Sequence, residues 1–185
     1  MQSDNGEGFN YEVFWKRAVT SAVAADLISN AIKQKSDDIF ITALLQDIGI
    51  VVLYLCMSDE YQKVFDEKRV SAAPVVEAEK KIFGFDHPEV STRVLEKWGL
   101  PETIFMPIQY HHKSKNIPEN VENKARILWL ADRMSSVYHG ARCAEKMKDI
   151  NRTLGRNYGF SEEDINQLID EVAGKSVEIL SYFEI

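Results

Sequence analysis

The sequence predicts an all-α fold with a single compact helical domain. Apolar side chains recur every three or four residues along most of the chain, which is the spacing of one helix face. Capping residues, prolines and glycines interrupt this pattern where helices would begin and end. The chain has 185 residues, of which 45% are apolar, enough for one domain with a sizeable core. Little of the sequence alternates as a half-buried strand does.

The individual helices follow from these signals in chain order. Residues 14–32 combine apolar and small side chains at helical spacing, and residues 38–57 follow a run of capping groups, so each segment is predicted to form one long helix. The remaining helices are expected over residues 59–68, 74–84, 87–98, 101–109, 121–138 and 162–183. Residues 140–159 are expected to form a short helix and a loop. Trp98 is expected in the core.

The composition argues against several classes of protein. The chain has 22 Lys and Arg against 29 Asp and Glu, and its formal charge of -7 disfavours a general nucleic-acid or anionic-membrane binder. The most apolar run, residues 39–57, contains polar side chains, so no membrane span is expected. Residues 1–10 are polar and are expected to be a disordered or tag-like stretch. Cys56 and Cys143 match no metal or redox spacing and are expected to be buried free thiols of a cytoplasmic protein.

Ionisable side chains occur where helical spacing predicts core. Asp47 and Asp132 each follow apolar residues by one helical turn, as do the neighbouring His111 and His112, and His87 lies at a predicted helix N-terminus. A buried carboxylate must find hydrogen bonds, a cation or a metal. Taken singly, each residue is explained as a satisfied core group or a helix cap. Together, on successive helices, they would suit Zn²⁺, Fe or Mn²⁺.

Several short motifs carry a resemblance to a known family. Residues 43–49, ALLQDIG, resemble the LLHDIG segment of the HD superfamily, with Gln46 in place of a metal-binding histidine. Residues 83–90, FGFDHPEV, resemble its G-x-D-H-P-x-x-G segment, with Ser91 where a glycine is usual. The sequences WGLP and IQYHH further along are typical of HDOD domains. Over roughly residues 11–138 the chain therefore resembles the HDOD family, all-helical output domains related to the HD-GYP group.

The resemblance implies where a metal site would lie in an active relative. There, residues at these positions would hold two or three metal ions that activate water against a phosphate ester or a cyclic dinucleotide. Two departures predict a degenerate site here. Gln46 offers a weak neutral amide, and Arg17 lies in the segment where active relatives carry another histidine. A cation there would repel a metal and could pair with Asp47 or Asp132.

The sequence therefore predicts a degenerate cluster with no catalytic residue, no cofactor and no metal, in which the old ligands form a buried hydrogen-bonded group. Its members are Gln46, Asp47, His87, His111, His112 and Asp132. Should a metal bind, its ligands are expected among Asp47, His87, His111, His112 and Asp132.

For function, the resemblance implies a non-catalytic bacterial signalling output module that acts through a protein partner or a nucleotide, without nucleic acid or membrane. One alternative is a residual metal-dependent phosphohydrolase acting on a nucleotide or cyclic di-GMP. Another is a helical interaction domain of a different family whose motif matches arise by chance. Residues 11–185 are expected to be the HDOD-like domain without the family's N-terminal helical part. A receiver or other regulatory domain would precede it, and an apolar face left uncovered could form a homodimer.

Overall fold

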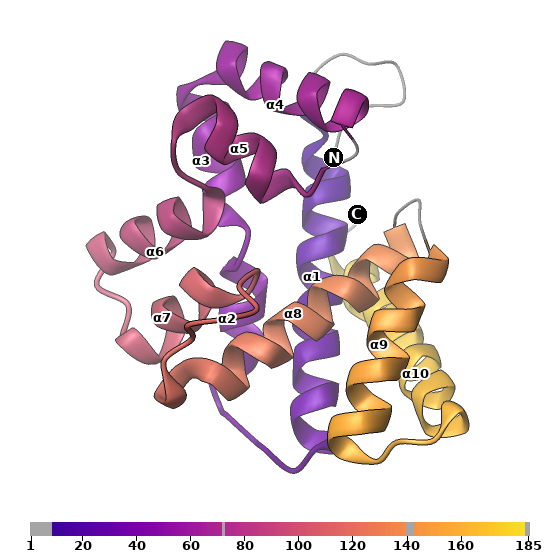
Figure 1. Ribbon diagram of the computed structural model, residues 1–185. Helices are drawn as coiled ribbons and strands as arrows, with labels where there is room; N and C mark the ends of the chain where they lie inside the picture. The colour runs from indigo at the N-terminus through magenta and orange to yellow at the C-terminus, as the bar shows by residue number, and fades with distance from the viewer. Residues whose placement is uncertain (1–8, 72, 140–142, 184–185) are drawn as a thin grey trace.

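This computed structural model describes residues 9–71, 73–139 and 143–183. These residues form ten α-helices and the loops that join them. Figure 1 shows their arrangement, in which the central α1 contacts α2, α8 and α10. The helices are α1 (Tyr11–Ala31), α2 (Ile39–Leu45), α3 (Ile48–Cys56), α4 (Ser58–Ser71), α5 (Val75–Phe83), α6 (His87–Lys97), α7 (Glu102–Tyr110), α8 (Glu119–His139), α9 (Cys143–Tyr158) and α10 (Glu162–Tyr182). The all-α prediction is confirmed.

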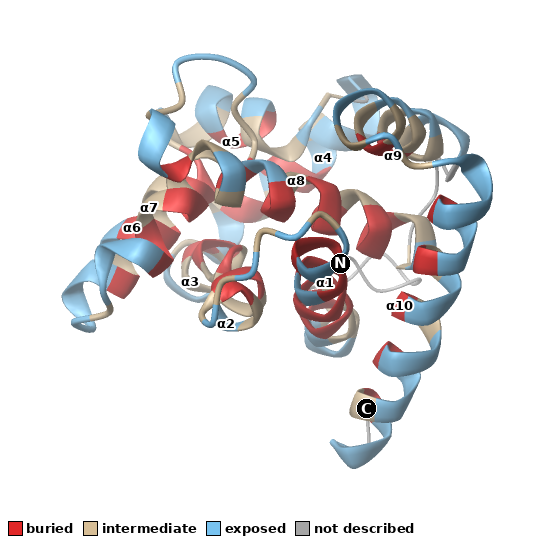
Figure 2. Cartoon of the chain, turned by 90° about the horizontal axis from the view of Figure 1, so that it is seen from below, coloured by how far each residue is buried: buried red, intermediate tan, exposed pale blue. Residues whose placement is uncertain are grey.

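The small residues of α1 explain its central position. Ala22, Ala24 and Ala25 are fully buried, and their short side chains let neighbouring helices approach this stretch closely. Figure 2 shows α1 end-on with buried residues around it, while the outer face of α10 is exposed. The first turn is fixed by Asn10, whose side chain accepts a hydrogen bond from the Val13 amide at 2.9 Å.

Two apolar cores lie on either side of the break between α2 and α3. The larger core includes residues of α1, α2, α7, α8, α9 and α10, among them Ile28, Ala43 and Leu128. The smaller core is rich in aromatic rings, including Phe14 and Tyr61, and gathers the start of α1 with α3, α4 and α5. The chain passes from one core to the other between α2 and α3. Any polar residue at that break therefore lies between the two cores.

The single helix predicted over residues 38–57 is wrong, because the chain breaks at Gln46 and Asp47 into α2 and α3. The apolar spacing of the sequence does not reveal this break, because both helices have apolar faces. The face of α2 packs into the larger core and that of α3 into the smaller core. By length and composition alone, residues 39–56 would also suit a membrane-spanning helix. Within this fold 39% of that window is buried, with Ile39 and Ala43 in the larger core and Ile50 and Leu53 in the smaller one.

Three further expectations need correction. Residues 143–158 form a full helix, because Ile150 and Leu154 lie one turn apart and are both fully buried. Trp98 is not in the core but 62% exposed at the end of α6. Cys56 is exposed rather than buried, and the side chain of Cys143 lies outside the described residues.

Residues 1–10 were expected to be a disordered or tag-like stretch, and the structure describes only residues 9 and 10 of it. Phe9 is buried in the smaller core, and Asn10 caps α1, so both belong to the folded domain. Residues 1–8 lie outside the described residues.

A charged pair fixes the start of α2 against α8. Lys124 Nζ donates to Asp38 Oδ1 at 2.5 Å and to the Thr103 carbonyl at 3.0 Å, and the Ser36 hydroxyl donates to the same carboxylate oxygen at 2.5 Å. Partial burial acts to raise the pKa of Asp38, but the hydrogen bonds and charge of Lys124, with that of Ser36, lower the pKa to about 2.

Asp38→Asn is expected to lower the free energy of unfolding by about 1–2 kcal/mol at pH 7. The folded-state pKa lies below the unfolded value, so this stabilisation is complete above about pH 4 and disappears as the pH falls towards 2. Urea unfolding of both proteins from pH 7 to pH 2 measures the difference. A gap that stays constant across this range would contradict the assigned ion pair.

Candidate functional site

Four of the residues singled out from the sequence meet beside the break between α2 and α3. The potential ligand atoms of Asp47, His87, His111 and His112 all lie within 4.8 Å of one another. Asp47 Oδ1 is 3.3 Å from Nε2 of His87 and 3.4 Å from Nε2 of His111. His87 begins α6, and His111 and His112 directly follow α7. Two segments far apart in the sequence thus bring imidazoles to the carboxylate of a third.

The position of Asp47 depends on a close approach of α3 to α6. A Cβ added at Gly49 would lie 2.3 Å from the His87 carbonyl oxygen, so only glycine fits there. The Ser91 hydroxyl accepts from the Gly49 amide at 2.8 Å and donates to the Gln46 carbonyl at 3.0 Å. These bonds satisfy backbone groups that the helix break would otherwise leave unpaired. Ser91 therefore stabilises the turn that presents Asp47.

His87 is held by a buried carboxylate on α5. Glu79 Oε2 lies 2.7 Å from His87 Nδ1 and accepts from the His87 amide at 2.9 Å. Its other oxygen accepts from the Tyr61 hydroxyl at 2.8 Å. A carboxylate only accepts, so His87 Nδ1 carries the proton in this contact. The ring is thereby oriented with Nε2 towards Asp47.

His111 is oriented in the same way by the backbone. Its Nδ1 lies 2.6 Å from the Ile108 carbonyl oxygen, which can only accept, so this nitrogen also carries the proton. In the neutral ring, Nε2 is then an acceptor directed at Asp47. Buried histidines held by a carboxylate or carbonyl on one nitrogen, with the other nitrogen free, are the usual arrangement of metal ligands.

This geometry demands a positive charge at the centre of the cluster. With both rings neutral, two imidazole lone pairs would face a carboxylate, and neither Nε2 has a hydrogen bond among the described residues. Burial alone would raise the pKa of Asp47, but His111 and His87 hold that pKa well below its ordinary value. Burial alone would lower the pKa of His87, yet Glu79 and Asp47 raise it to about 10. A proton or a metal ion can supply the charge.

Two of the separations among the donor atoms fit a metal ion. In a tetrahedral zinc site with bonds of about 2.0–2.1 Å, neighbouring ligand atoms lie about 3.3–3.4 Å apart. The two measured distances from Asp47 Oδ1, 3.3 and 3.4 Å, match this edge length. His112 supplies a further imidazole. Burial, together with the charges of His111 and His87, holds the pKa of His112 well below its ordinary value, so this ring is neutral and able to ligate.

The other two predicted residues are placed differently. Asp132 lies outside the four-residue group. Its Oδ1 accepts from Arg17 Nη2 at 3.1 Å, which is one of the two pairings that the sequence suggested for this arginine. Gln46 is buried, and neither atom of its side-chain amide has a hydrogen bond within the described part of the chain. Asp132 is thus paired with a cation instead of facing the Asp47 cluster.

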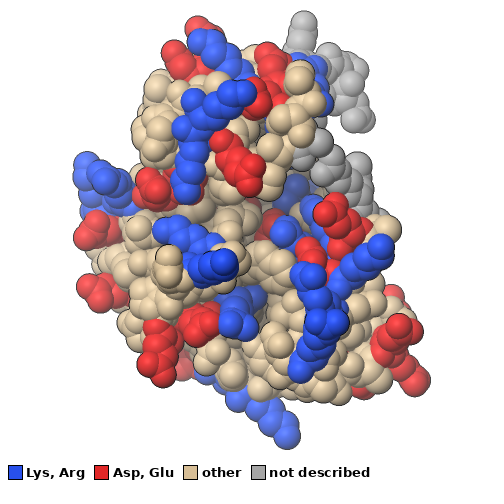
Figure 3. Space-filling view, in the orientation of Figure 1, with Lys and Arg blue, Asp and Glu red and all other residues tan. Residues whose placement is uncertain are grey.

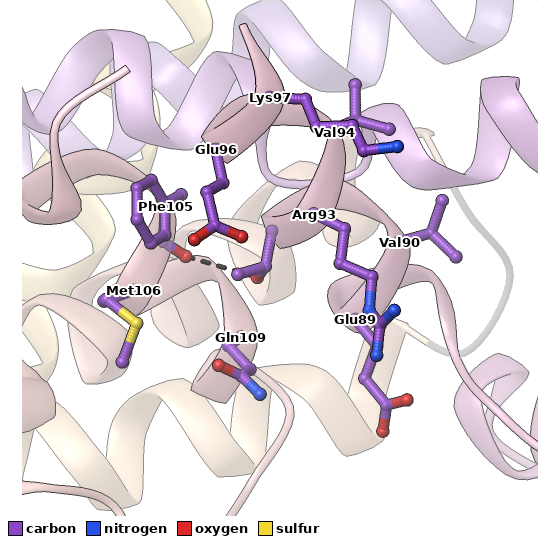
Figure 4. A pocket seen from close by; sticks show the side chains of 10 residues that line it. Glu89, Val90, Arg93, Val94, Glu96, Lys97, Phe105, Met106 and Gln109 are labelled. Carbon is purple, nitrogen blue, oxygen red and sulfur yellow. Dashed lines mark hydrogen bonds between the residues drawn. The ribbon is translucent and has the colours of Figure 1, made fainter. Parts of the chain in front are cut away.

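A surface pocket of about 620 Å³ between α6 and α7 shares no residue with this cluster. Figure 4 shows charged side chains of both signs around it, including Glu89, Arg93, Glu96 and Lys97. Only the Asp47 cluster combines buried imidazoles with a carboxylate, so the cluster is the better candidate site.

Comparison with known proteins identifies the family. The model of the HDOD domain matches residues 1–114 of this chain. The chain belongs to the HDOD family. No curated protein matches the sequence.

Solved structures of HDOD proteins share the fold. An HDOD domain protein of unknown function from Geobacter sulfurreducens is 23% identical with a TM-score of 0.70, over 92% of this chain and 61% of its own. The response regulator MmoQ from Methylococcus capsulatus is 24% identical with a TM-score of 0.66, over 87% and 62%. A protein from Shewanella amazonensis named for phosphohydrolase activity is 18% identical with a TM-score of 0.70, over 91% and 61%. The chain thus spans about three fifths of these proteins.

Sequence reasoning gave no role to three residues that support this HDOD site: Tyr61, Glu79 and Ser91. A signal for Glu79 was present, because it lies one turn after Val75 and one turn before Phe83 on the apolar side of α5. Fully buried Tyr61 reads as an ordinary core aromatic. Ser91 stands out only as a departure from the family's glycine.

Gly49→Ala is expected to destabilise the HDOD domain by about 1–3 kcal/mol, because the new Cβ would overlap the His87 carbonyl. The matched control is Gly174→Ala in α10, where an added Cβ meets nothing within 4 Å. That change should stabilise by about 0.5–1 kcal/mol through helix propensity. Denaturant unfolding distinguishes the two, and equal effects would contradict the close approach.

Asp47→Ala is expected to lower the free energy of unfolding by about 1–3 kcal/mol, because the buried His87 ring, whose pKa is raised to about 10, loses the carboxylate that faces it. Asp170→Ala, at an exposed position on α10, serves as the control and should change little. Unchanged stability in Asp47→Ala, together with loss of a measurable activity, would contradict the structural role of Asp47.

Proposed function

We propose that this chain is a non-catalytic signalling output domain that acts in the bacterial cytoplasm through a protein partner. Membership of the HDOD family supports a signalling role, as does the name of the response regulator that shares its fold. A receiver or other regulatory domain is the proposed source of the signal.

The ion pair between Arg17 and Asp132 is the observation that carries this proposal. A hydrolytic metal site keeps a coordination position open for water. The four donors at Asp47 would fill a tetrahedral site, and Asp132, the remaining carboxylate implied by the family, is engaged by Arg17 instead. A tetrahedral ion such as Zn²⁺ held by four protein side chains has no position left for a nucleophile.

A metal bound by Asp47, His87, His111 and His112 would therefore be structural. When bound, the ion would supply positive charge between the carboxylate and the imidazole nitrogens. The protein's own part is to orient the rings: Glu79 and the Ile108 carbonyl fix which nitrogen of His87 and His111 faces Asp47. Without a metal, a proton shared between His87 and Asp47 would stabilise the same arrangement.

Exposed Trp98 supports the proposed protein partner. Its side chain is 62% exposed on the last turn of α6, and exposed tryptophans are enriched among the residues that dominate protein–protein binding energy. An indole in this position contributes little to folding and is available for contact.

A second candidate function is a residual metal-dependent phosphohydrolase. It is favoured by the preformed set of four donor atoms and by the name of the Shewanella relative. This function requires one of the four ligands to leave the ion and make room for water.

Titration of the chelator-treated protein with Co²⁺ tests the proposal. We expect at most one ion per chain, with the intense visible absorption of four-coordinate cobalt, and no hydrolysis of bis-p-nitrophenyl phosphate or cyclic di-GMP. Asp47→Ala should abolish ion binding. Asp132→Asn is the matched control and should retain it, because Asp132 pairs with Arg17 rather than with the cluster. Turnover that depends on metal and on Asp47 would favour the phosphohydrolase.

A further inference from the structure

Three basic side chains gather at a second place, where α1, α8 and α9 meet. Arg17 comes from α1, Arg133 from α8 and Lys146 from α9. Lys146 lies one helical turn before Asp149 on α9, and Asp149 Oδ2 is 3.4 Å from Arg133 Nε, so the lysine lies on the side of α9 that faces Arg133. In Figure 3, Lys and Arg side chains lie with acidic ones in the hollow between α4 and α5 above and α8 and α9 below. The protein carries a net charge of -7, so this concentration of basic groups is local.

Both guanidinium groups are held in fixed positions. Arg17 Nη2 donates to Asp132 Oδ1 at 3.1 Å and to the Ser136 hydroxyl at 3.0 Å. The Arg133 guanidinium lies 4.7 Å from the centre of the Trp129 ring, and its Nε is 3.4 Å from Asp149 Oδ2. Groups already fixed lose little further entropy when they bind a ligand.

The acidic groups at this place do not neutralise the basic ones. Asp132 is shared by Arg17 and Arg133, and Asp149 is shared by Arg133 and Arg152. Lys146 is half-buried and has no ion-pair partner within the described ranges. A basic group that is partly desolvated beside two arginines is destabilised until an anion reaches it.

We infer that Arg17, Arg133 and Lys146 form a binding site for the phosphoryl group of a small molecule. Guanidinium groups bind phosphate oxygens through paired hydrogen bonds, and an ammonium group adds a point charge. Burial lowers the pKa of Lys146 to about 8, and Asp132 acts to raise it. The charges of Arg17, Arg133 and Lys68 add to the lowering. A bound phosphoryl group opposes this shift and keeps the lysine charged.

The inference does not rest on the proposed function or on a bound metal. The site uses Arg17 and Arg133, neither of which belongs to the Asp47 cluster. The phosphoryl-binding site can therefore be tested on chelator-treated protein. A phosphohydrolase activity at the Asp47 cluster would contradict the proposed function but not this site.

Calorimetric titration with inorganic pyrophosphate at low ionic strength tests the site. We expect saturable binding, weakened about tenfold or more by Lys146→Gln through loss of a charge-assisted hydrogen bond. Lys148→Gln is the matched control, because Lys148 is exposed on the same helix, and it should bind as the unchanged protein does. Asp47→Ala should also bind normally. Equal weakening by both lysine variants would overturn the site, as would the absence of saturable binding at millimolar pyrophosphate.

A nucleoside diphosphate titrated in the same way identifies the source of the phosphoryl group. Tighter binding than pyrophosphate assigns a nucleotide ligand, and equal binding assigns the phosphate group alone. Selective acetylation at pH 8 in saturating pyrophosphate, mapped by mass spectrometry, gives a readout at the level of single lysines. Pyrophosphate should protect Lys146 and leave Lys148 reactive, and an unprotected Lys146 would contradict the inference.

Discussion

A largely buried carboxylate facing two imidazole nitrogens is the constraint on which the rest of this structure depends. Asp47 and the Nε2 atoms of His87 and His111 would repel one another if both rings were neutral, because all three would be acceptors. The fold keeps them together by fixing the opposite nitrogen of each ring through Glu79 and the Ile108 carbonyl. Positive charge at the centre is then a structural requirement, whether a proton or a metal ion supplies it.

The other residues to which the family motifs pointed differ in the contacts that they make. Arg17, together with Arg133, pairs with Asp132 and so neutralises this buried carboxylate. Ser91 stands where related sequences usually carry glycine, and its hydroxyl bridges the backbone of Gln46 and Gly49. Gln46 gains no such partner for its amide within the described residues. Arg17 and Ser91 thus make polar contacts around the cluster, whereas the Gln46 amide makes none among the described residues.

The sequence predicted the fold class, most of the helices and the four residues that converge. Periodicity placed Asp47 and Asp132 equally on apolar faces, but it could not say which partner each would meet, because that depends on the packing of α1 against α8. The break at Gln46 and Asp47 was missed because apolar spacing continues through it, from one core into the other. Trp98 was misplaced because its hydrophobicity predicts burial, whereas the end of α6 leaves it exposed. Glu79 and Ser91 act through contacts with other helices, which local sequence does not encode.

The place of the Asp47 cluster between two cores has a consequence for how the domain unfolds. His111 directly follows α7, which packs into the larger core. His87 lies in the sequence between Phe85 and Val90, and both of these side chains pack against the smaller core. The central positive charge therefore joins two regions that each have their own apolar interior. The start of α1 also packs into the smaller core, so the two regions are joined at two places, by this helix and by the charge. Removal of the charge is expected to let α3, α4 and α5 exchange their amide hydrogens faster than the helices of the larger core.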